Sequence, residues 1–329
     1  MELNRIYHGD CRNMDKIDSN SVHLTVTSPP YFLNKDYEDY LPKFSDYLQM
    51  LYGVFAEVVR VTVPGGKICI NLGDIAIGFD KVKYNLNWEY DSKFSTWFGM
   101  HKKPVSGQVY CAPTIFDPDK KFNPVIDPEK FVEEIPIMPS LVDYLRTIDT
   151  YLHARIIWEK DDPWANSSHV SFHSKIQHAE YRMLPAWESL FVFRKGKTAR
   201  IDKSPVDGRF IDKEEWKKLV HGVWKIRSVQ KNDFHEAMFP EELVANCIKL
   251  YSFPGDIVLD NFSGSGTTAA VAKKLGRNYV GYDIESKYVR MAEGRIASIN
   301  ESMIQDTPEY RDKTVNRKEL QGSIFDVPV

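Results

Sequence analysis

The sequence predicts an α/β fold with a doubly wound, mostly parallel sheet. Short β-branched and apolar runs at residues 21–27, 67–72, 256–260 and 279–283 are separated by segments in which apolar residues recur at helical spacing. The first and third of these runs end in loops rich in proline or glycine. Alternation of this kind places helices on both faces of a parallel sheet.

The composition is typical of a globular protein with reduced thiols. At 329 residues and 43% hydrophobic content, the chain has room for one large α/β domain with insertions. No apolar run reaches membrane-spanning length and the amino terminus lacks a secretory signal, so we expect a cytoplasmic protein without a membrane partner. Scattered cysteines without CxxC spacing predict free thiols and no metal site: Cys11, Cys69, Cys111 and Cys247.

Each expected element has a sequence signal at its start or end. The apolar periodicity of 44–63 stops at Pro-Gly-Gly, and Pro240 suits the first turn of a helix. Residues 77–138 have no sustained period and are assigned to an insertion from one sheet edge, whereas the tail, 301–329, has no assigned role. In order, the elements are strand 21–27, helix 44–63, strand 67–72, helix 139–152, strands 154–158 and 189–194, helix 239–251, strand 256–260, helix 267–275, strand 279–283 and helix 285–300.

The segment DNFSGSGTT, residues 260–268, suits the binding of a nucleoside. Gly264 and Gly266 allow backbone angles and a close approach that a Cβ would prevent, and a helix with unpaired N–H groups follows. Asp283 ends the next strand 19 residues after Gly264 (283 − 264), the spacing at which a carboxylate binds ribose hydroxyls. Ala269 occupies the third glycine position of the dinucleotide motif, which disfavours NAD. A glycine turn that serves helix packing alone is the alternative.

The segment TSPPY, residues 27–31, suits a flat base that carries an exocyclic amine. The Ser28 hydroxyl and the Pro29 carbonyl can accept the two amine hydrogens, because the prolines lack N–H groups and hold the preceding residue extended. Tyr31 offers a stacking face worth roughly 1–3 kcal/mol. Such a base must first leave the duplex. The alternative is a rigid exit from the strand with a buried tyrosine.

Together these two segments resemble the catalytic and cofactor motifs of the amino-group, S-adenosylmethionine-dependent DNA methyltransferases. The resemblance is to the class in which the catalytic motif comes first, and it extends to IYHGDC, PGGKICINLGD, ARIIWEK, ESLFVFRKG and FHEAMFPEELV. It implies a seven-stranded Rossmann-like methyltransferase sheet with inserted target-recognition segments. The catalytic domain would comprise 1–76, 139–196 and 234–300.

The resemblance also implies a role for each matching residue, with S-adenosylmethionine as methyl donor and no metal. Methyl transfer would be direct and in line, and the absence of a Pro-Cys pair agrees with this. A simple turn role for Asp10 stays open. The implied catalytic residues are Ser28, Pro29, Pro30 and Tyr31. The implied cofactor-binding residues are Asp10, His235, Phe239, Pro240, Asp260, Phe262, Gly264, Gly266, Thr267, Thr268 and Asp283.

Serine in the SPPY segment favours one target base. In the family that the chain resembles, SPPY is usual for N4-cytosine enzymes and DPPY or NPPY for N6-adenine enzymes. We therefore expect methylation of cytosine N4 in duplex DNA, in a prokaryotic cytoplasm, as protection against a cognate restriction endonuclease. The alternatives are an N6-adenine enzyme, an inactive DNA-binding regulator, and a methyltransferase acting on RNA or a protein amide. The sequence predicts neither the recognition sequence nor the oligomeric state.

Segments outside the resemblance are the candidates for DNA recognition. Residues 197–233 occupy the position of the target recognition region, and the insertion 77–138 could share its role. The overall net charge is −3, but residues 194–231 contain 12 Lys/Arg against 5 Asp/Glu, which suggests phosphate contacts or a solvated connector. We expect the histidines of residues 161–183 to make polar loop contacts, not to bind metal. They are His169, His173 and His178.

Overall fold

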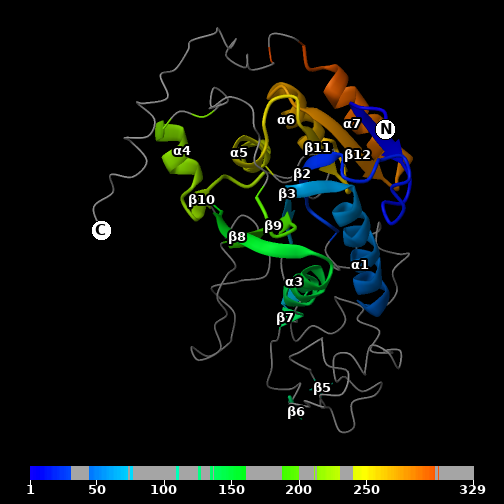
Figure 1. Ribbon diagram of the computed structural model, residues 1–329, viewed down its shortest axis with the longest axis vertical. Helices are drawn as coiled ribbons and strands as arrows, with labels where there is room; N and C mark the ends of the chain where they lie inside the picture. Colours follow the sequence, from blue (N-terminus) through cyan, green and yellow to red (C-terminus); the bar gives the residue numbers. More distant parts are fainter. Residues whose placement is uncertain are drawn as a thin grey trace, which may run out of the picture.

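The main sheet is mixed and carries helices on both of its faces (Figure 1). Among the described residues it has eight strands in the order β1-β12-β11-β2-β3-β9-β8-β10. The computed structural model describes residues 1–30, 44–72, 137–160, 187–199, 213–229 and 240–300, positions 211 and 303, and four two-residue strands.

The bounds of the elements are as follows. The sheet strands are β1 (Arg5–His8), β2 (Val22–Thr27), β3 (Thr62–Asn71), β8 (Thr150–Glu159), β9 (Trp187–Lys195), β10 (Val223–Lys225), β11 (Ile257–Asp260) and β12 (Asn278–Asp283). The helices are α1 (Phe44–Val61), α3 (Ile137–Thr147), α4 (Lys213–Leu219), α5 (Glu241–Tyr251), α6 (Thr267–Lys274) and α7 (Ser286–Ala297).

Strand direction creates one functional edge of the sheet. Within the eight described strands of the main sheet, only β9 runs antiparallel to its neighbours; the other pairings of this sheet are parallel. The carboxyl ends of the parallel strands and the amino end of β9 therefore lie at the same edge, where ligands of open α/β sheets bind. This edge is called the carboxyl edge below.

Two apolar clusters hold the helices to the sheet. On one face α1 and α3 pack against the strands through residues such as Phe55 and Leu141. On the other face α5, α6 and α7 pack through residues such as Val244 and Ala270. The predicted doubly wound, mostly parallel α/β sheet is therefore confirmed.

The predicted number of seven strands is wrong, because β10 adds an eighth. Its three residues pair in parallel with β8 through Trp224 and Trp158. The sequence around β10 is charged and the strand is too short for alternation to be recognised. It lies inside the region 197–233, so part of that candidate recognition region extends the catalytic sheet.

The end of α1 also differs from the prediction. The helix was expected to run to residue 63, but it ends at Val61 and β3 begins at once. The Pro-Gly-Gly segment is an irregularity within the strand, where Gly65 has a φ of 81°. The pairing of β3 with β2 jumps from Val22↔Thr62 to Leu24↔Lys67 across it.

The second helix is shorter than predicted and begins earlier. It was expected at 139–152, but α3 ends at Thr147 and Asp149 turns the chain with a φ of 59°. The strand that follows then begins at Thr150. Within the predicted insertion, 77–138, the structure describes β5 (Val109–Tyr110), β6 (Val125–Ile126), β7 (Glu134–Ile135) and the start of α3. β5 pairs with β6, and β7 pairs with β4 (Ile75–Ala76), which lies just before the insertion.

Candidate active site

The strands that lead into the two diagnostic loops lie side by side. β2 pairs with β11 through Leu24↔Val258. At the carboxyl edge, the Thr27 hydroxyl donates a 2.9 Å hydrogen bond to Asp260 Oδ1. Both side chains are buried, so this contact joins the ends of β2 and β11 in a water-poor setting. The SPP loop and the glycine loop consequently begin next to each other, although about 230 residues separate them in sequence.

Asp260 is a buried carboxyl held by short-range donors. Burial raises the pKa of Asp260 to about 6, against the hydrogen bonds from Thr268, Thr27 and the Phe262 N–H, which lower it. The Phe262 N–H lies 3.1 Å from Oδ1. Oδ2 has no hydrogen-bond partner among the described residues. A buried acceptor of this kind fixes the start of the glycine loop and leaves one oxygen for a further donor.

The SPP loop is held from the α1 side. Ser28 is half-buried and Pro29 is buried. The Tyr47 hydroxyl, on α1, donates a 2.8 Å hydrogen bond to the Pro30 carbonyl. The Pro30 carbonyl therefore already accepts a hydrogen bond within the protein. Tyr31 lies outside the described residues.

The glycine loop needs glycine for two separate reasons. Gly264 and Gly266 have φ values of 48° and 77°, in the left-handed region. A Cβ on Gly266 would also lie 2.7 Å from the Cβ of Ala292 on α7. The loop can thus pack against α7 and turn into α6 only without side chains at these positions.

The two threonines after the loop bond to the protein through their hydroxyls. The Arg295 guanidinium donates to Thr267 Oγ1 at 3.0 Å, and it also binds Glu241 at 2.7 Å. The Thr268 hydroxyl donates to the Val26 carbonyl of β2 at 3.3 Å. The first turn of α6 is thereby tied both to α7 and to the strand that leads into SPP, and its N–H groups face the loop end.

Asp283 lies at the end of β12 with both oxygens on backbone amides. Oδ2 accepts the Gly264 N–H at 2.8 Å and Oδ1 accepts the Glu285 N–H at 2.9 Å. Burial raises the pKa of Asp283, against the hydrogen bonds of these two amides. A carboxylate has about four acceptor positions, so each oxygen can accept another donor.

The structure brings some of the remaining predicted cofactor residues to the same edge. Asp10 follows β1, whose last residue pairs with Asp283, and its carboxylate accepts the Arg12 N–H at 2.8 Å. Burial acts to raise the pKa of Asp10, but the hydrogen bonds from Arg12 outweigh it and the pKa is lowered. Phe262 packs against the α1-side core, and Pro240 is the buried residue before α5. His235 and Phe239 lie outside the described residues.

Sequence reasoning missed two residues that support the loops, Tyr47 and Arg295. Tyr47 sits within an ordinary amphipathic helix, where an aromatic residue predicts only core packing. Arg295 likewise looks like a solvated helix residue. Their partners are 17 and 28 residues away in sequence, so only the folded structure reveals the contacts.

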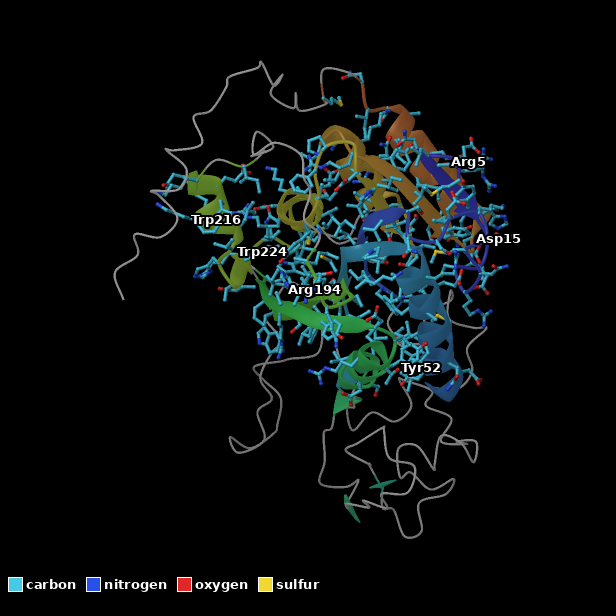
Figure 2. The ribbon with its side chains drawn as sticks, in the orientation of Figure 1. Arg5, Asp15, Tyr52, Arg194, Trp216 and Trp224 are labelled. Carbon is cyan, nitrogen blue, oxygen red and sulfur yellow. The ribbon has the colours of Figure 1, made fainter. Side chains whose placement is uncertain are left out.

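The described residues of the basic stretch 194–231 lie in two separate places. Arg194 and Lys195 lie at the end of β9, opposite the carboxyl edge, and donate to backbone carbonyls; the Lys195 ammonium reaches the Thr62 carbonyl at 2.8 Å. Other basic residues lie on α4 and β10. Trp216 on α4 is 51% exposed, whereas Trp224 on β10 is buried, and both lie at the far end of the sheet from β12 (Figure 2).

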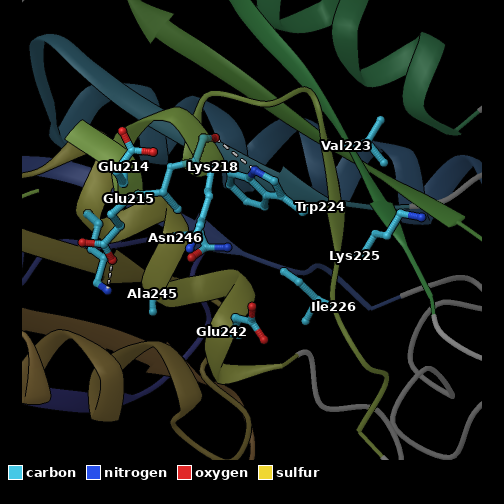
Figure 3. A pocket seen from close by; sticks show the side chains of 12 residues that line it. Glu214, Glu215, Lys218, Val223, Trp224, Lys225, Ile226, Glu242, Ala245 and Asn246 are labelled. Atoms are coloured by element: carbon cyan, nitrogen blue, oxygen red, sulfur yellow. Dashed lines mark hydrogen bonds and ion pairs between the residues drawn. The ribbon is translucent and has the colours of Figure 1, made fainter. Parts of the chain in front are cut away.

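A polar cavity of about 560 Å³ lies between α4, β10 and α5 (Figure 3). Its walls carry both charge signs, and the Lys249 ammonium bonds Glu215 at 2.6 Å. The Trp224 indole N–H donates to the Leu219 carbonyl at 3.0 Å, which holds α4 against β10. The cavity is thus built by the candidate recognition region together with α5, and none of its lining residues belongs to the SPP or glycine loops.

Comparison with known proteins decides the family. The family model for N6/N4 DNA methylases matches residues 22–294. The chain belongs to this family. It is 29% identical to the Type II methyltransferase M.BglI of Bacillus subtilis over 95% of its own length and 91% of that protein. It is 28% identical to M.XycI of Xanthomonas campestris pv. cyanopsidis, with 91% and 90% covered. The predicted amino-group DNA methyltransferase of the restriction–modification type is confirmed.

Solved structures agree with this fold. A putative DNA modification methylase from Thermus thermophilus aligns with a TM-score of 0.58 and 24% identity, covering 91% of this chain and 94% of that one. The PvuII DNA methyltransferase aligns with a TM-score of 0.55 and 17% identity, covering 92% and 90%. A DNA methylase of this family takes its methyl group from S-adenosylmethionine.

The described residues offer neither a metal-binding cluster nor a membrane-spanning helix. In the part of the chain that the structure describes, no group of three His, Cys, Asp or Glu side chains is arranged to hold a metal ion. No helix within the described ranges has both the length and the apolar composition of a membrane span. The three histidines of residues 161–183 lie outside those ranges.

Proposed function

We propose that the chain transfers the methyl group of S-adenosylmethionine to the exocyclic N4 of cytosine in duplex DNA. The observation that carries the proposal is the Thr27–Asp260 hydrogen bond, because it joins the strands that lead into the two loops. An amine on the SPP loop and a nucleoside on the glycine loop would then meet at one edge. The base reaches this edge by leaving the duplex.

The residues around the glycine loop fit the cofactor. Asp283 keeps acceptor positions for ribose hydroxyls beyond the two amides that it binds. Phe262 would pack on the cofactor and Asp10 would face its adenine. His235, Phe239 and Pro240 would line the methionine end. Asp260, Gly264 and Gly266 would shape the loop, and Thr267 and Thr268 would contribute backbone N–H groups. The Thermus thermophilus methylase is described in complex with S-adenosylmethionine, which supports this assignment.

The SPP loop provides acceptors for the amine. S-adenosylmethionine supplies an electrophilic methyl carbon on its sulfonium. Ser28 Oγ would accept one amine hydrogen and the Pro29 carbonyl the other, which turns the nitrogen lone pair out of the ring plane. Tyr47 already occupies the Pro30 carbonyl, so Pro29 is the better candidate of the two prolines. Tyr31 would stack on the base.

Cytosine is proposed over adenine on two grounds. Serine precedes the prolines, and the PvuII enzyme, which shares the fold, is named as cytosine-N4-specific. N6-adenine methylation on the same loop is the second candidate, because adenine also presents an amine to the same acceptors. An inactive regulator is disfavoured, since Ser28, Pro29 and Pro30 are all present. A substrate of RNA or a protein amide is disfavoured by the family.

Analysis of the methylated nucleoside tests the choice of base. Unmodified genomic DNA is incubated with the protein and S-adenosylmethionine, digested to nucleosides and separated by mass spectrometry. We expect the N4-methylcytosine deoxynucleoside as the product, and far less in the same time with the Ser28→Ala variant, which controls for contaminating enzymes. N6-methyladenine as the sole product would contradict the cytosine assignment while leaving the family intact.

Biological context follows from the same proposal. Methylation in the cytoplasm of a prokaryotic cell would protect a recognition site from a cognate restriction endonuclease. Residues 197–233, with α4 and β10, are proposed to read that site, together with the insertion 77–138. The Type II relatives support this pairing.

A further inference from the structure

A row of four polar side chains crosses the carboxyl edge next to the SPP loop. Ser28 follows β2, Asn71 ends β3, Glu188 is the second residue of β9 and Lys160 follows β8. These four strands are consecutive neighbours in the sheet. Each of these residues is two positions from a member of the apolar cluster on the α5 side of the sheet. Side chains alternate along a strand, which puts Asn71 and Glu188 on that face, and Lys160 pairs with Glu188 there. Ser28 continues the alternation of β2. The cluster members are Val26, Cys69, Leu190 and Trp158.

Glu188 contacts the two other members of this row apart from Ser28, which are Asn71 and Lys160. Its Oε2 accepts the Asn71 amide at 3.1 Å, and its Oε1 forms an ion pair with the Lys160 ammonium. Asn71 is 2% exposed, and the Lys160 and Glu188 side chains are 17% and 20% exposed. A carboxylate, an amide and an ammonium are therefore held together in a largely desolvated position at the edge.

Stability does not explain this arrangement well. Desolvation of a half-buried ion pair offsets much of its attraction, so such a pair adds little to folding. The row lies at the carboxyl edge, where open α/β sheets bind their ligands, so a functional role is the better explanation. The Lys160 ammonium has three N–H donors, and Glu188 is its one hydrogen-bonding partner among the described residues. Donors remain for a ligand.

We propose that this row recognises the ring edge of the extrahelical base, with Lys160 donating to an acceptor on the same edge as the amine. The inference rests on the proposed function, in which Ser28 binds the amine of the base. The row then contacts the remainder of the same base edge. The acceptor is N3 or O2 of cytosine. A DNA phosphate is disfavoured, because the Glu188 carboxylate beside Lys160 would repel it. An uncharged base edge is not repelled by the Glu188 carboxylate and can bind beside the Glu188–Lys160 pair.

The spacing of the strands suits a base. β2 and β9 are two strand spacings apart, about 10 Å, roughly the width of a base with a hydrogen bond on each side. Lys160 follows β8, one strand further, and forms its ion pair with Glu188 on β9. Ser28 lies at one end of this span and the Glu188–Lys160 pair at the other. Lys160 is therefore a specificity-determining residue in this proposal, whereas Asn71 and Glu188 position it.

A coupling experiment tests whether Lys160 contacts the base. The recognition site is first found by sequencing modified DNA. Affinities are then measured, with S-adenosylhomocysteine present, for an unmethylated duplex that carries this site and for the same duplex with the target base removed. Lys160→Met should weaken binding of the intact duplex by roughly tenfold, as for one charge-assisted hydrogen bond. Binding of the abasic duplex should change by less than about twofold. Lys160→Arg, which keeps charge and donors, should retain part of the preference.

The control is Lys274→Met, which removes the ammonium of another partly exposed Lys–Glu pair, between α6 and α5. It should bind both duplexes as the wild type does. Equal losses on the two duplexes with Lys160→Met would overturn the proposal, because Lys160 would then contact the backbone or act only structurally. Unchanged affinity of Lys160→Met for both duplexes would also overturn the proposal. The site used is whichever base is methylated, so an adenine product would refute the N4-cytosine assignment without deciding the role of Lys160.

Discussion

Replacing Ser28 by alanine is expected to lower kcat by roughly 10²–10³-fold, the cost of removing one preorganised hydrogen-bonding group at a reacting centre. The hydroxyl is proposed to accept an amine hydrogen, which makes the nitrogen lone pair available. The affinity for S-adenosylmethionine should not change, because the cofactor is assigned to the glycine loop. Steady-state kinetics and calorimetry measure the two quantities.

Ser21→Ala provides the matched control for this variant. Ser21 precedes β2 at the opposite edge of the sheet, and its hydroxyl donates to the Asp18 carbonyl at 2.7 Å. It should leave turnover and cofactor affinity unaltered. Wild-type turnover by Ser28→Ala would mean that the SPP loop does not hold the reacting amine.

Replacing Asp283 by alanine is expected to weaken S-adenosylmethionine binding by roughly 10–100-fold, as for loss of hydrogen bonds to a charged group. The side chain is proposed to bind the ribose, and it also holds the Gly264 amide at 2.8 Å. Turnover should recover in part at saturating cofactor. Calorimetry with S-adenosylmethionine gives the affinity directly.

Two further variants separate ribose binding from loop support. Asp283→Asn keeps an oxygen for one backbone amide but loses the charge, so its affinity should fall between the wild type and alanine. Asp18→Ala removes a carboxylate that pairs with the amino terminus and should bind as the wild type does. If Asp283→Ala binds the cofactor with unchanged affinity, its assignment to the ribose is wrong.

The strands and loops of the cofactor half were predictable because local signals coincide there. The run 256–260 is largely apolar, the glycines that follow suit a tight turn into a helix, and Asp283 falls at a defined spacing. The structure has β11, α6 and β12 close to the expected bounds. When propensity, turn residues and spacing agree, the structure of such a segment can be predicted from its sequence.

Elements that depend on distant partners were not predictable. β10 has three residues and exists because β8 offers it a free edge. The Pro-Gly-Gly segment lies within β3 because β2 pairs with Thr62 before it and with Lys67 after it. Tertiary pairing overrides local propensity in both cases. In the candidate site, the same applies to the Tyr47 hydroxyl and to the Glu188–Lys160 pair, whose members lie 28 residues apart in sequence.

A crystal structure of the protein with S-adenosylhomocysteine would test most directly whether the methyl donor and the target amine meet at the contact between β2 and β11. The account predicts ribose hydroxyls within about 2.6–3.2 Å of the Asp283 carboxylate and the cofactor sulfur facing Ser28. A cofactor bound away from Asp283, or one whose sulfur points away from the SPP loop, would contradict it.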